Sequence, residues 1–346
     1  MKQEFLFNKP FTLESGRTIN NLRLAYTTLG KLNATGDNVI WIFHALTGNS
    51  NPVEWWPGLV GEEYLFSPEK YFIICVNMPG SCYGSSGPLD INPDTNEPYY
   101  HNFPLFTTRD MIRSYQPLKD QLGIRKIHVG IGGSMGGQQL LEWAIEEPEL
   151  FEYIIPIATN AKHSPWGIAF NASQRMCIEN DASWKNSNDD AGIEGMKIAR
   201  SIALISYRHY ETYLHSQQGI TKHTADASVD EIVFNAETYQ QYQGEKLANR
   251  FNAFSYYFLS RTMDTHDLGR GRGSVEEALQ KIKSKTLAVG ITTDILFPPS
   301  EQLFIAEHVQ GAHFKTITSL YGHDGFLLEY KQLAQIINHF LQTNHS

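Results

Sequence analysis

Cysteine is scarce in this chain of 346 residues, and the three that occur, Cys75, Cys82 and Cys177, have no paired spacing. So sparse and odd a set provides neither a disulfide framework nor the clustered ligands of a zinc site. Long apolar runs are also missing, because no stretch reaches the roughly 18 residues that a membrane-spanning helix needs. The first residues include acid and amide side chains where a secretory signal would be apolar. We therefore expect a soluble, cytoplasmic protein that uses no metal and no membrane.

Basic residues are too few to dominate the surface. The 28 Lys and Arg are outnumbered by 37 Asp and Glu, which gives a net charge of -9. A protein that binds nucleic acid would be expected to present a basic face, so we do not expect nucleic acid as a partner. Apolar residues make up 41% of the chain and charged residues 19%, a balance typical of a globular enzyme and unlike that of a disordered chain.

Short apolar runs alternate with segments of helical periodicity. The first run, at residues 22–28, alternates apolar and polar residues as a half-exposed strand does. The others read as strands buried on both faces of a parallel sheet, and they lie at residues 38–43, 71–76, 127–131, 153–158, 286–292 and 314–319. Between residues 162 and 268 such runs disappear, and amphipathic helical segments replace them. We therefore predict an α/β fold, in which a doubly wound, mostly parallel sheet of residues 1–161 and 269–346 is interrupted by a helical lid at residues 162–268.

A serine flanked by glycines stands where a strand-like run meets a helix-like one. The sequence Gly-Gly-Ser-Met-Gly occupies residues 132–136, and it separates the run at 127–131 from a helical segment at 138–147. Strand, Gly-x-Ser-x-Gly and helix is the context of a nucleophile elbow. Glycines at the flanking positions remove the Cβ atoms that would collide in so tight a turn. A passive Gly-rich turn is the alternative, but the context predicts that Ser134 is a nucleophile.

A serine hydroxyl needs a histidine as base and a carboxylate that orients it. In this architecture they follow in the order serine, acid, histidine. Asp294 follows the strand-like run at 286–292, and His323 follows the run at 314–319. Both therefore lie at the same end of the sheet as Ser134 and complete a candidate Ser-His-Asp triad. Other residues fit less well: His44 precedes the serine, His128 is inside a strand, His163, His209 and His215 are in the helical part, and Asp264 and Asp267 do not follow a strand.

Acyl transfer also requires two hydrogen-bond donors for the oxyanion. The backbone N–H of Met135, the residue after the nucleophile, is one. The second should come from the loop His-Ala-Leu-Thr-Gly at residues 44–48, which follows an early strand. We favour Leu46 as this donor, with Ala45 and Thr47 as alternatives.

Six motifs together resemble the homoserine O-acetyltransferase family of α/β hydrolases. The resemblance extends from about residue 10 to residue 342, and the motifs are specific when taken jointly. They lie at residues 44–48, 77–88, 132–138, 168–171, 294–299 and 322–326.

The resemblance implies an acyltransferase that works in two steps. Ser134 would take an acetyl group from acetyl-CoA, a co-substrate and not a bound cofactor, and pass it to the hydroxyl of L-homoserine on the route to methionine. Members of the family bind the amino acid through an arginine and an acid. By this likeness, Arg208 would bind the carboxylate and Asp324 the amino group, as a guanidinium fork suits a carboxylate. The resemblance also implies a homodimer.

Several alternatives stay open at this stage. The same triad would serve an esterase or a lactonase, because water and homoserine attack the same acyl-enzyme. The donor could be succinyl-CoA and the acceptor serine, or the chain could be a binding module without activity. Arg270 and Arg272 in the Gly-rich segment 269–274 could meet coenzyme phosphates or mark a hinge, and Arg175 could bind substrate or pair with acids of the lid.

Overall fold

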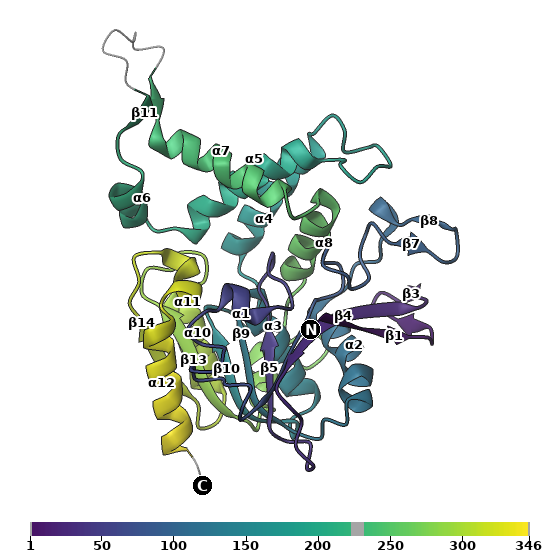
Figure 1. The fold of residues 1–346 in the computed structure, drawn as a ribbon, viewed down its shortest axis with the longest axis vertical. Helices are drawn as coiled ribbons and strands as arrows, with labels where there is room; N and C mark the ends of the chain where they lie inside the picture. Colours follow the sequence, from purple (N-terminus) through teal and green to yellow (C-terminus); the bar gives the residue numbers. More distant parts are fainter. Residues whose placement is uncertain (1, 223–231, 345–346) are drawn as a thin grey trace.

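An eight-stranded sheet forms the centre of the computed structural model, which describes residues 2–222 and 232–344 (Figure 1). Its first two strands run antiparallel to their neighbours, and the other six are parallel. Along the sheet the order is β1 (Lys2–Phe7), β4 (Leu22–Leu29), β6 (Phe72–Val76), β5 (Val39–Phe43), β9 (Ile127–Gly133), β10 (Phe151–Ile157), β13 (Lys285–Ile291) and β14 (His313–Ile317). The prediction of an α/β fold with a mostly parallel sheet is therefore confirmed.

Helices cover both faces of the sheet, which explains why its central strands are apolar throughout. Along β5, Val39, Trp41 and Phe43 pack into one core cluster, while Ile40 and Ile42 pack into the other. This alternation follows from the two-residue period of a strand. The first cluster is covered by α2 (Thr108–Gln121), α3 (Met135–Glu146), α9 (Val275–Leu279) and α10 (Pro299–His308), and the second by α12 (Tyr330–Thr343).

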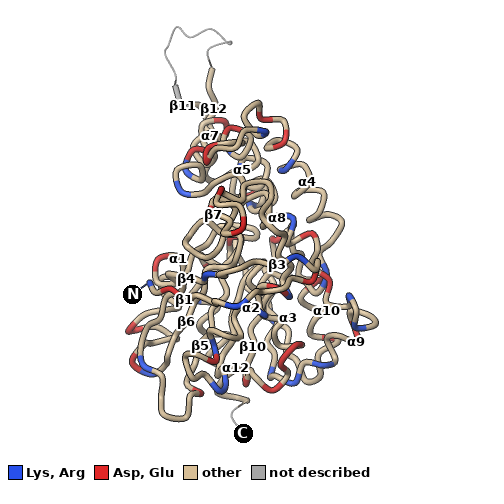
Figure 2. The backbone as a smooth tube through the Cα atoms, turned by 90° about the vertical axis from the view of Figure 1, so that its right-hand side faces the viewer, with Lys and Arg blue, Asp and Glu red and all other residues tan. Residues whose placement is uncertain are grey.

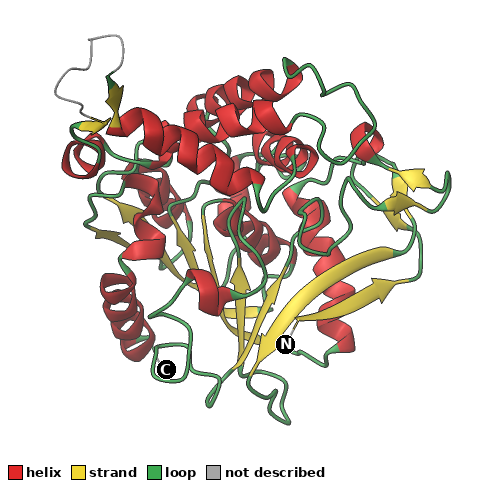
Figure 3. Ribbon diagram, turned by 45° about the horizontal axis from the view of Figure 1, so that its top comes forward, coloured by secondary structure: helices red, strands yellow, loops and turns green. Residues whose placement is uncertain are grey.

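A layer of helices lies across the end of the sheet where the parallel strands finish (Figures 1 and 3). It contains α4 (Pro165–Glu179), α5 (Ile193–Tyr207), α6 (Tyr210–Ser216), α7 (Asn235–Ala248) and α8 (Ala253–Asp264). Helices α4 and α8 begin at capping residues: the side chains of Ser164 and Asn252 accept hydrogen bonds from the N–H groups of Gly167 and Ser255. The layer occupies the part of the chain in which we expected a lid, and the boundaries at residues 162 and 268 stay a prediction.

The chain enters and leaves this helical layer at one place. The N–H of His163 donates to the carbonyl of His266, and the N–H of Leu268 donates to the carbonyl of Ala161, at 2.9 and 3.0 Å. The two connections therefore lie side by side and run antiparallel.

Small elements complete the fold. They are the hairpins β2 (Phe11–Thr12) with β3 (Thr18–Ile19), β7 (Ile91–Asn92) with β8 (Glu97–Pro98) and β11 (Ile220–Lys222) with β12 (Val233–Phe234), and the short helices α1 (Pro52–Trp55) and α11 (Gly325–Leu328). No helix among the described residues is both long and apolar enough to span a membrane. In the view of Figure 2, acidic and basic residues are interspersed both in the helical layer and around the sheet.

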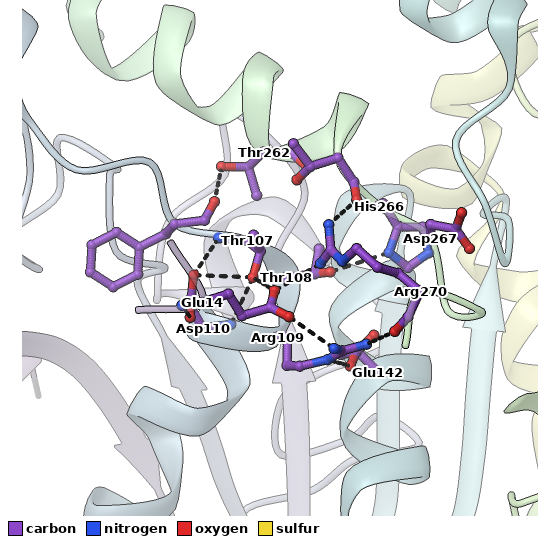
Figure 4. A network of polar contacts seen from close by, with 12 residues as sticks. Glu14, Thr107, Thr108, Arg109, Asp110, Glu142, Thr262, His266, Asp267 and Arg270 are labelled. Carbon is purple, nitrogen blue, oxygen red and sulfur yellow. Dashed lines mark hydrogen bonds and ion pairs between the residues drawn. The ribbon is translucent and has the colours of Figure 1, made fainter. Parts of the chain in front are cut away.

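A partly buried network of charges fastens the segment that returns from the helical layer (Figure 4). Arg109 of α2 donates to Glu142 and Glu14 at 2.7 and 2.8 Å, and to the backbone carbonyl of Arg270 at 3.0 Å. Arg270 in turn pairs with Glu14, and Arg272 with Glu142 and Glu146. These ion pairs engage both arginines of the Gly-rich segment, so the structure does not support a coenzyme-binding role or a loose hinge for them.

Candidate active site

Ser134 lies in a strained turn between β9 and α3. Its φ of 56° and ψ of −127° are unusual for a residue with a side chain. Neighbouring backbone leaves no room for other side chains: a Cβ on Gly132 would lie 2.6 Å from the carbonyl carbon of Gly136, and one on Gly136 would lie 2.1 Å from the oxygen of Phe43. The N–H of Ser134 donates to Ile157, and its carbonyl accepts the hydroxyl of Thr159. These contacts hold the strained conformation in place, as expected for an elbow.

His323 and Asp294 meet at the same end of the sheet. The ring Nδ1 of His323 is 2.7 Å from Oδ2 of Asp294, and the other carboxylate oxygen accepts the backbone N–H groups of Leu296 and Phe297 at 2.9 Å. Asp294 therefore accepts from three donors, which fixes the plane of its carboxylate and the orientation of the ring. Burial alone would lower the pKa of His323, but the negative charge and hydrogen bond of Asp294, with the charge of Asp324, outweigh it and raise the pKa above 6.5.

A cavity of about 460 Å³ brings the nucleophile and the base to one surface. Ser134 and His323 both line it, although each is at most 5% exposed. Within the described residues no hydrogen bond joins the serine hydroxyl to the ring. Such contacts often tighten only when substrate binds. The structure therefore brings the three sequence-predicted residues of the triad to one place.

The two expected oxyanion donors flank the nucleophile. Met135 begins α3, where a backbone N–H has no partner within the helix. Ala45, Leu46 and Thr47 line the cavity next to Ser134. Across residues 2–222 and 232–344, neither the N–H of Leu46 nor that of Met135 donates to a protein acceptor. Both are therefore available to a ligand, and the roles that we predicted for them stay predictions.

The two residues expected to bind the amino acid pair with each other. Nη2 of Arg208 is 3.2 Å from Oδ2 of Asp324. Asp324 lines the cavity, but Arg208 does not. Its Nε and Nη1 are buried without a hydrogen-bond partner among the described residues. Asp324 therefore lies at the cavity wall, and Arg208 contacts Asp324 without lining the cavity itself.

Arg200 of α5, the helix that ends just before Arg208, does line the cavity, and it was not predicted from the sequence. Arg200 lies over the ring of Tyr207 at 5.4 Å, and both residues face the space next to His323. The seven-residue spacing of Arg200 and Tyr207 on a helix puts them on one face, and this signal could have revealed the pair. Arg250 also lines the cavity and donates to the carbonyl of Thr47 at 2.7 Å.

The competing residues are engaged elsewhere. Asp264 ends α8 and pairs with Arg175, and Asp267 pairs with Lys162. Arg175 therefore pairs with an acid of the helical layer, the second of the roles that we considered for it. No group of three or more His, Cys, Asp or Glu side chains within the described parts of the chain could hold a metal ion.

The fold and the elbow together define a class of protein. A family profile described as the alpha/beta hydrolase fold matches residues 38–330. A serine elbow after a central strand, followed in the chain by an acid and a histidine, is the arrangement of that class. The chain is an α/β hydrolase by fold.

Comparison with known proteins narrows this class. The homoserine O-acetyltransferase of Cyclobacterium marinum is 48% identical over 346 residues, which cover 100% of this chain and 97% of that protein. The homoserine O-acetyltransferase of Trichormus variabilis is 41% identical over 337 residues, which cover 96% of this chain and 92% of that protein. The chain belongs to the homoserine O-acetyltransferase family, as the motifs predicted.

Solved structures agree in fold. The homoserine O-acetyltransferase from Bacillus anthracis superposes with a TM-score of 0.90 at 24% identity, covering 100% of this chain and 98% of that one. Esterase E22 superposes with a TM-score of 0.89 at 23% identity, covering 99% of both chains. At such identities the likeness concerns the fold alone, and it is shared by a transferase and an esterase.

Proposed function

We propose that this protein transfers an acetyl group from acetyl-CoA to the hydroxyl of L-homoserine through an acetyl-Ser134 intermediate. One observation supports the proposal above the others: the cavity that exposes Ser134 and His323 also presents Arg200 and Asp324. An acceptor with both a carboxylate and an ammonium group would find the opposite charge for each. The relatives named homoserine O-acetyltransferase are consistent with this acceptor.

In the first half-reaction His323 removes the proton of Ser134 as the hydroxyl attacks the thioester carbonyl. The N–H groups of Met135 and Leu46 stabilise the resulting oxyanion. The carbon–sulfur bond then breaks, and the thiol of coenzyme A leaves with the proton from His323. Asp294 keeps Nδ1 of the ring protonated and stabilises the imidazolium while it holds that proton.

In the second half-reaction the homoserine hydroxyl attacks the acetyl-enzyme. His323 takes the hydroxyl proton and returns it to Ser134, and O-acetylhomoserine leaves. We propose that Asp324 binds the ammonium group and that Arg200 binds the carboxylate, because both line the cavity. The sequence-based assignment of the carboxylate to Arg208 stays an alternative, which its two unpartnered nitrogens favour.

A simple assay tests the proposal against hydrolysis. Free thiol would be followed with acetyl-CoA or succinyl-CoA, each with homoserine, with serine and without an acceptor. We expect fast thiol release only with acetyl-CoA and homoserine. Equal rates with and without homoserine would favour a hydrolase, and a preference for succinyl-CoA or serine would change the substrates.

We further propose that the protein is a cytoplasmic homodimer whose residues 162–268 act as a lid. Light scattering on the purified protein would test the dimer, and cell fractionation the location. Because the cavity is lined from both the sheet end and the helical layer, the lid would shield the acetyl-enzyme from water.

A further inference from the structure

His44 occupies a position next to the nucleophile that the mechanism above does not use. It follows β5 directly, and the backbone at the end of this strand lies against Gly136 of the elbow. The ring is 1% exposed. Its Nε2 lies 3.1 Å from the backbone nitrogen of Met78, and its Nδ1 lies 2.8 Å from the carbonyl oxygen of Ala45.

These two partners define the tautomer of the ring. The backbone N–H of Met78 can only donate, so Nε2 must be an unprotonated acceptor. Nδ1 therefore carries the hydrogen and donates it to the carbonyl of Ala45. Burial lowers the pKa of His44 to about 4, so the ring is neutral at physiological pH and keeps this arrangement.

The carbonyl of Ala45 is consequently held by two donors, because it also accepts the N–H of Gly48 at 2.9 Å. In a trans peptide the C=O of one residue and the N–H of the next point in opposite directions. Fixing the carbonyl of Ala45 toward His44 and Gly48 therefore turns the N–H of Leu46 to the other side. If the peptide rotated, it would instead present a carbonyl oxygen, which would repel an oxyanion.

We propose that His44 is a positioning residue, which orients the peptide between Ala45 and Leu46 so that its N–H points toward the oxyanion formed at Ser134. The inference rests on the proposed role of Ser134 as nucleophile, but not on the identity of the acceptor. Nothing about His44 involves proton transfer, since both ring nitrogens are occupied by backbone groups. Its contribution is made through the backbone N–H of Leu46.

Two substitutions separate the two bonds of the ring. In His44→Asn the amide nitrogen lies near the position of Nδ1 and can still donate to Ala45, but nothing reaches Met78. In His44→Gln the longer side chain reaches the position of Nε2 and can accept from Met78, but the donor to Ala45 is lost. His44→Leu removes both.

The measurements are the rates of Ser134 acetylation by acetyl-CoA and by p-nitrophenyl acetate in single-turnover experiments. The terms kcat and KM here refer to this half-reaction and are taken from its dependence on donor concentration. Loss of one oxyanion donor lowers kcat by about 10²–10³-fold in enzymes that use one. We expect about this decrease for His44→Gln and His44→Leu, with little change in KM, and a loss of less than about 10-fold for His44→Asn. Binding of a trifluoromethyl ketone analogue of acetyl-CoA, which forms an oxyanion on Ser134, should weaken in parallel with kcat, while binding of coenzyme A should not change.

His266→Asn is the matched control for loss of a buried, neutral histidine. The ring of His266 contacts Thr108 and the carbonyl of Asn160, away from the cavity. The His266→Asn substitution should lower the melting temperature of the protein, but it should not change the affinity for the ketone relative to the affinity for coenzyme A. Because p-nitrophenyl acetate needs no amino-acid acceptor, failure of homoserine transfer in the wild type would leave this test intact.

Three results would overturn the inference. They are equal activity of the Asn and Gln variants, wild-type kcat in His44→Leu, and ketone affinity that does not follow kcat. If His44→Leu does not fold, the comparison of Asn with Gln decides the question by itself, because each variant keeps one of the two bonds.

Discussion

Asp324 and Arg208 form an ion pair at the edge of the cavity, with 3.2 Å between Oδ2 and Nη2. Side-chain exposure is below one fifth for both residues, so solvent screens the pair only partly. An ammonium group that binds Asp324 must share its carboxylate with Arg208. The negative charge that the proposed function assigns to the ammonium group is therefore already paired with a cation of the protein.

The first prediction concerns which arginine binds the acceptor's carboxylate. A charged hydrogen bond contributes about 1.5–3 kcal/mol, so Arg200→Met should lower kcat/KM for homoserine by roughly 10–100-fold. With 3-aminopropan-1-ol, which lacks the carboxylate, the same variant should match the wild type. If Arg208→Met shows this pattern instead, the sequence-based assignment is right.

The second prediction concerns Asp324. Asp324→Asn should lower transfer to homoserine by roughly 10–100-fold, since the ammonium group loses its charged partner. Transfer to 4-hydroxybutyrate, which has no ammonium group, should change little. Acetylation of Ser134 by acetyl-CoA should stay within a few-fold of the wild type. A parallel loss with both acceptors would indicate a general disturbance of the neighbouring His323.

The third prediction concerns the nucleophile. Ser134→Ala should lower turnover on the order of 10⁴–10⁶-fold, as in enzymes known to use a serine triad. Mass spectrometry of the wild type after mixing with acetyl-CoA should show one acetyl group on the peptide that contains Ser134. Acetyl on another residue, or an active alanine variant, would exclude this nucleophile.

The fourth prediction follows from the raised pKa of His323. Acetylation needs the neutral ring, so its rate should fall as the pH decreases through a midpoint above 6.5. In Asp294→Asn the charge that raises the pKa is removed and the effect of burial dominates, so the midpoint should move to lower pH. The titration of His323 can be followed by NMR in both proteins. A midpoint that does not move would show that Asp294 does not set the charge of the ring.

The fifth prediction concerns stability. Glu142 is almost fully buried between Arg109 and Arg272, so Arg272→Met leaves its carboxylate with one cation less. Breaking a buried pair costs about 3–5 kcal/mol, and we expect the lower end because Arg109 remains. Arg113→Met, which removes the more exposed pair with Glu146, should cost less than about 1 kcal/mol. Denaturant unfolding measures both, and equal effects would contradict a special role of the buried network.

The strongest local patterns in the sequence were sufficient for the sheet and the elbow. Strand β5 and the serine turn follow from apolar runs and glycine spacing, which depend on neighbouring residues alone. Strand β1 could not be found in this way, because Phe5 is its one buried residue and leaves no alternation to detect. Its pairing with β4 depends on the rest of the sheet.

The arginines near the cavity show the limit of prediction from the sequence. Helix α5 stops at Tyr207, and Arg208 follows in an extended conformation, with φ −107° and ψ 152°. Its side chain consequently leaves the helical face on which Arg200 and Tyr207 lie. A shift of one residue in the end of a helix is beyond the resolution of a periodicity argument, yet it decides which guanidinium faces the cavity.

The adjacent connections of the helical layer have a consequence for how such an enzyme can evolve. Since Ala161 and Leu268 are hydrogen-bonded neighbours, the hundred or so residues between them start and finish at one point on the sheet. An inserted segment of this kind can gain, lose or exchange residues while the strands that precede Ser134, Asp294 and His323 keep their register. If Arg200 binds the acceptor as proposed, the choice of acceptor can change on a separate part of the chain from the residues of the proposed triad. The shared architecture of transferases and esterases is what such independent variation would produce.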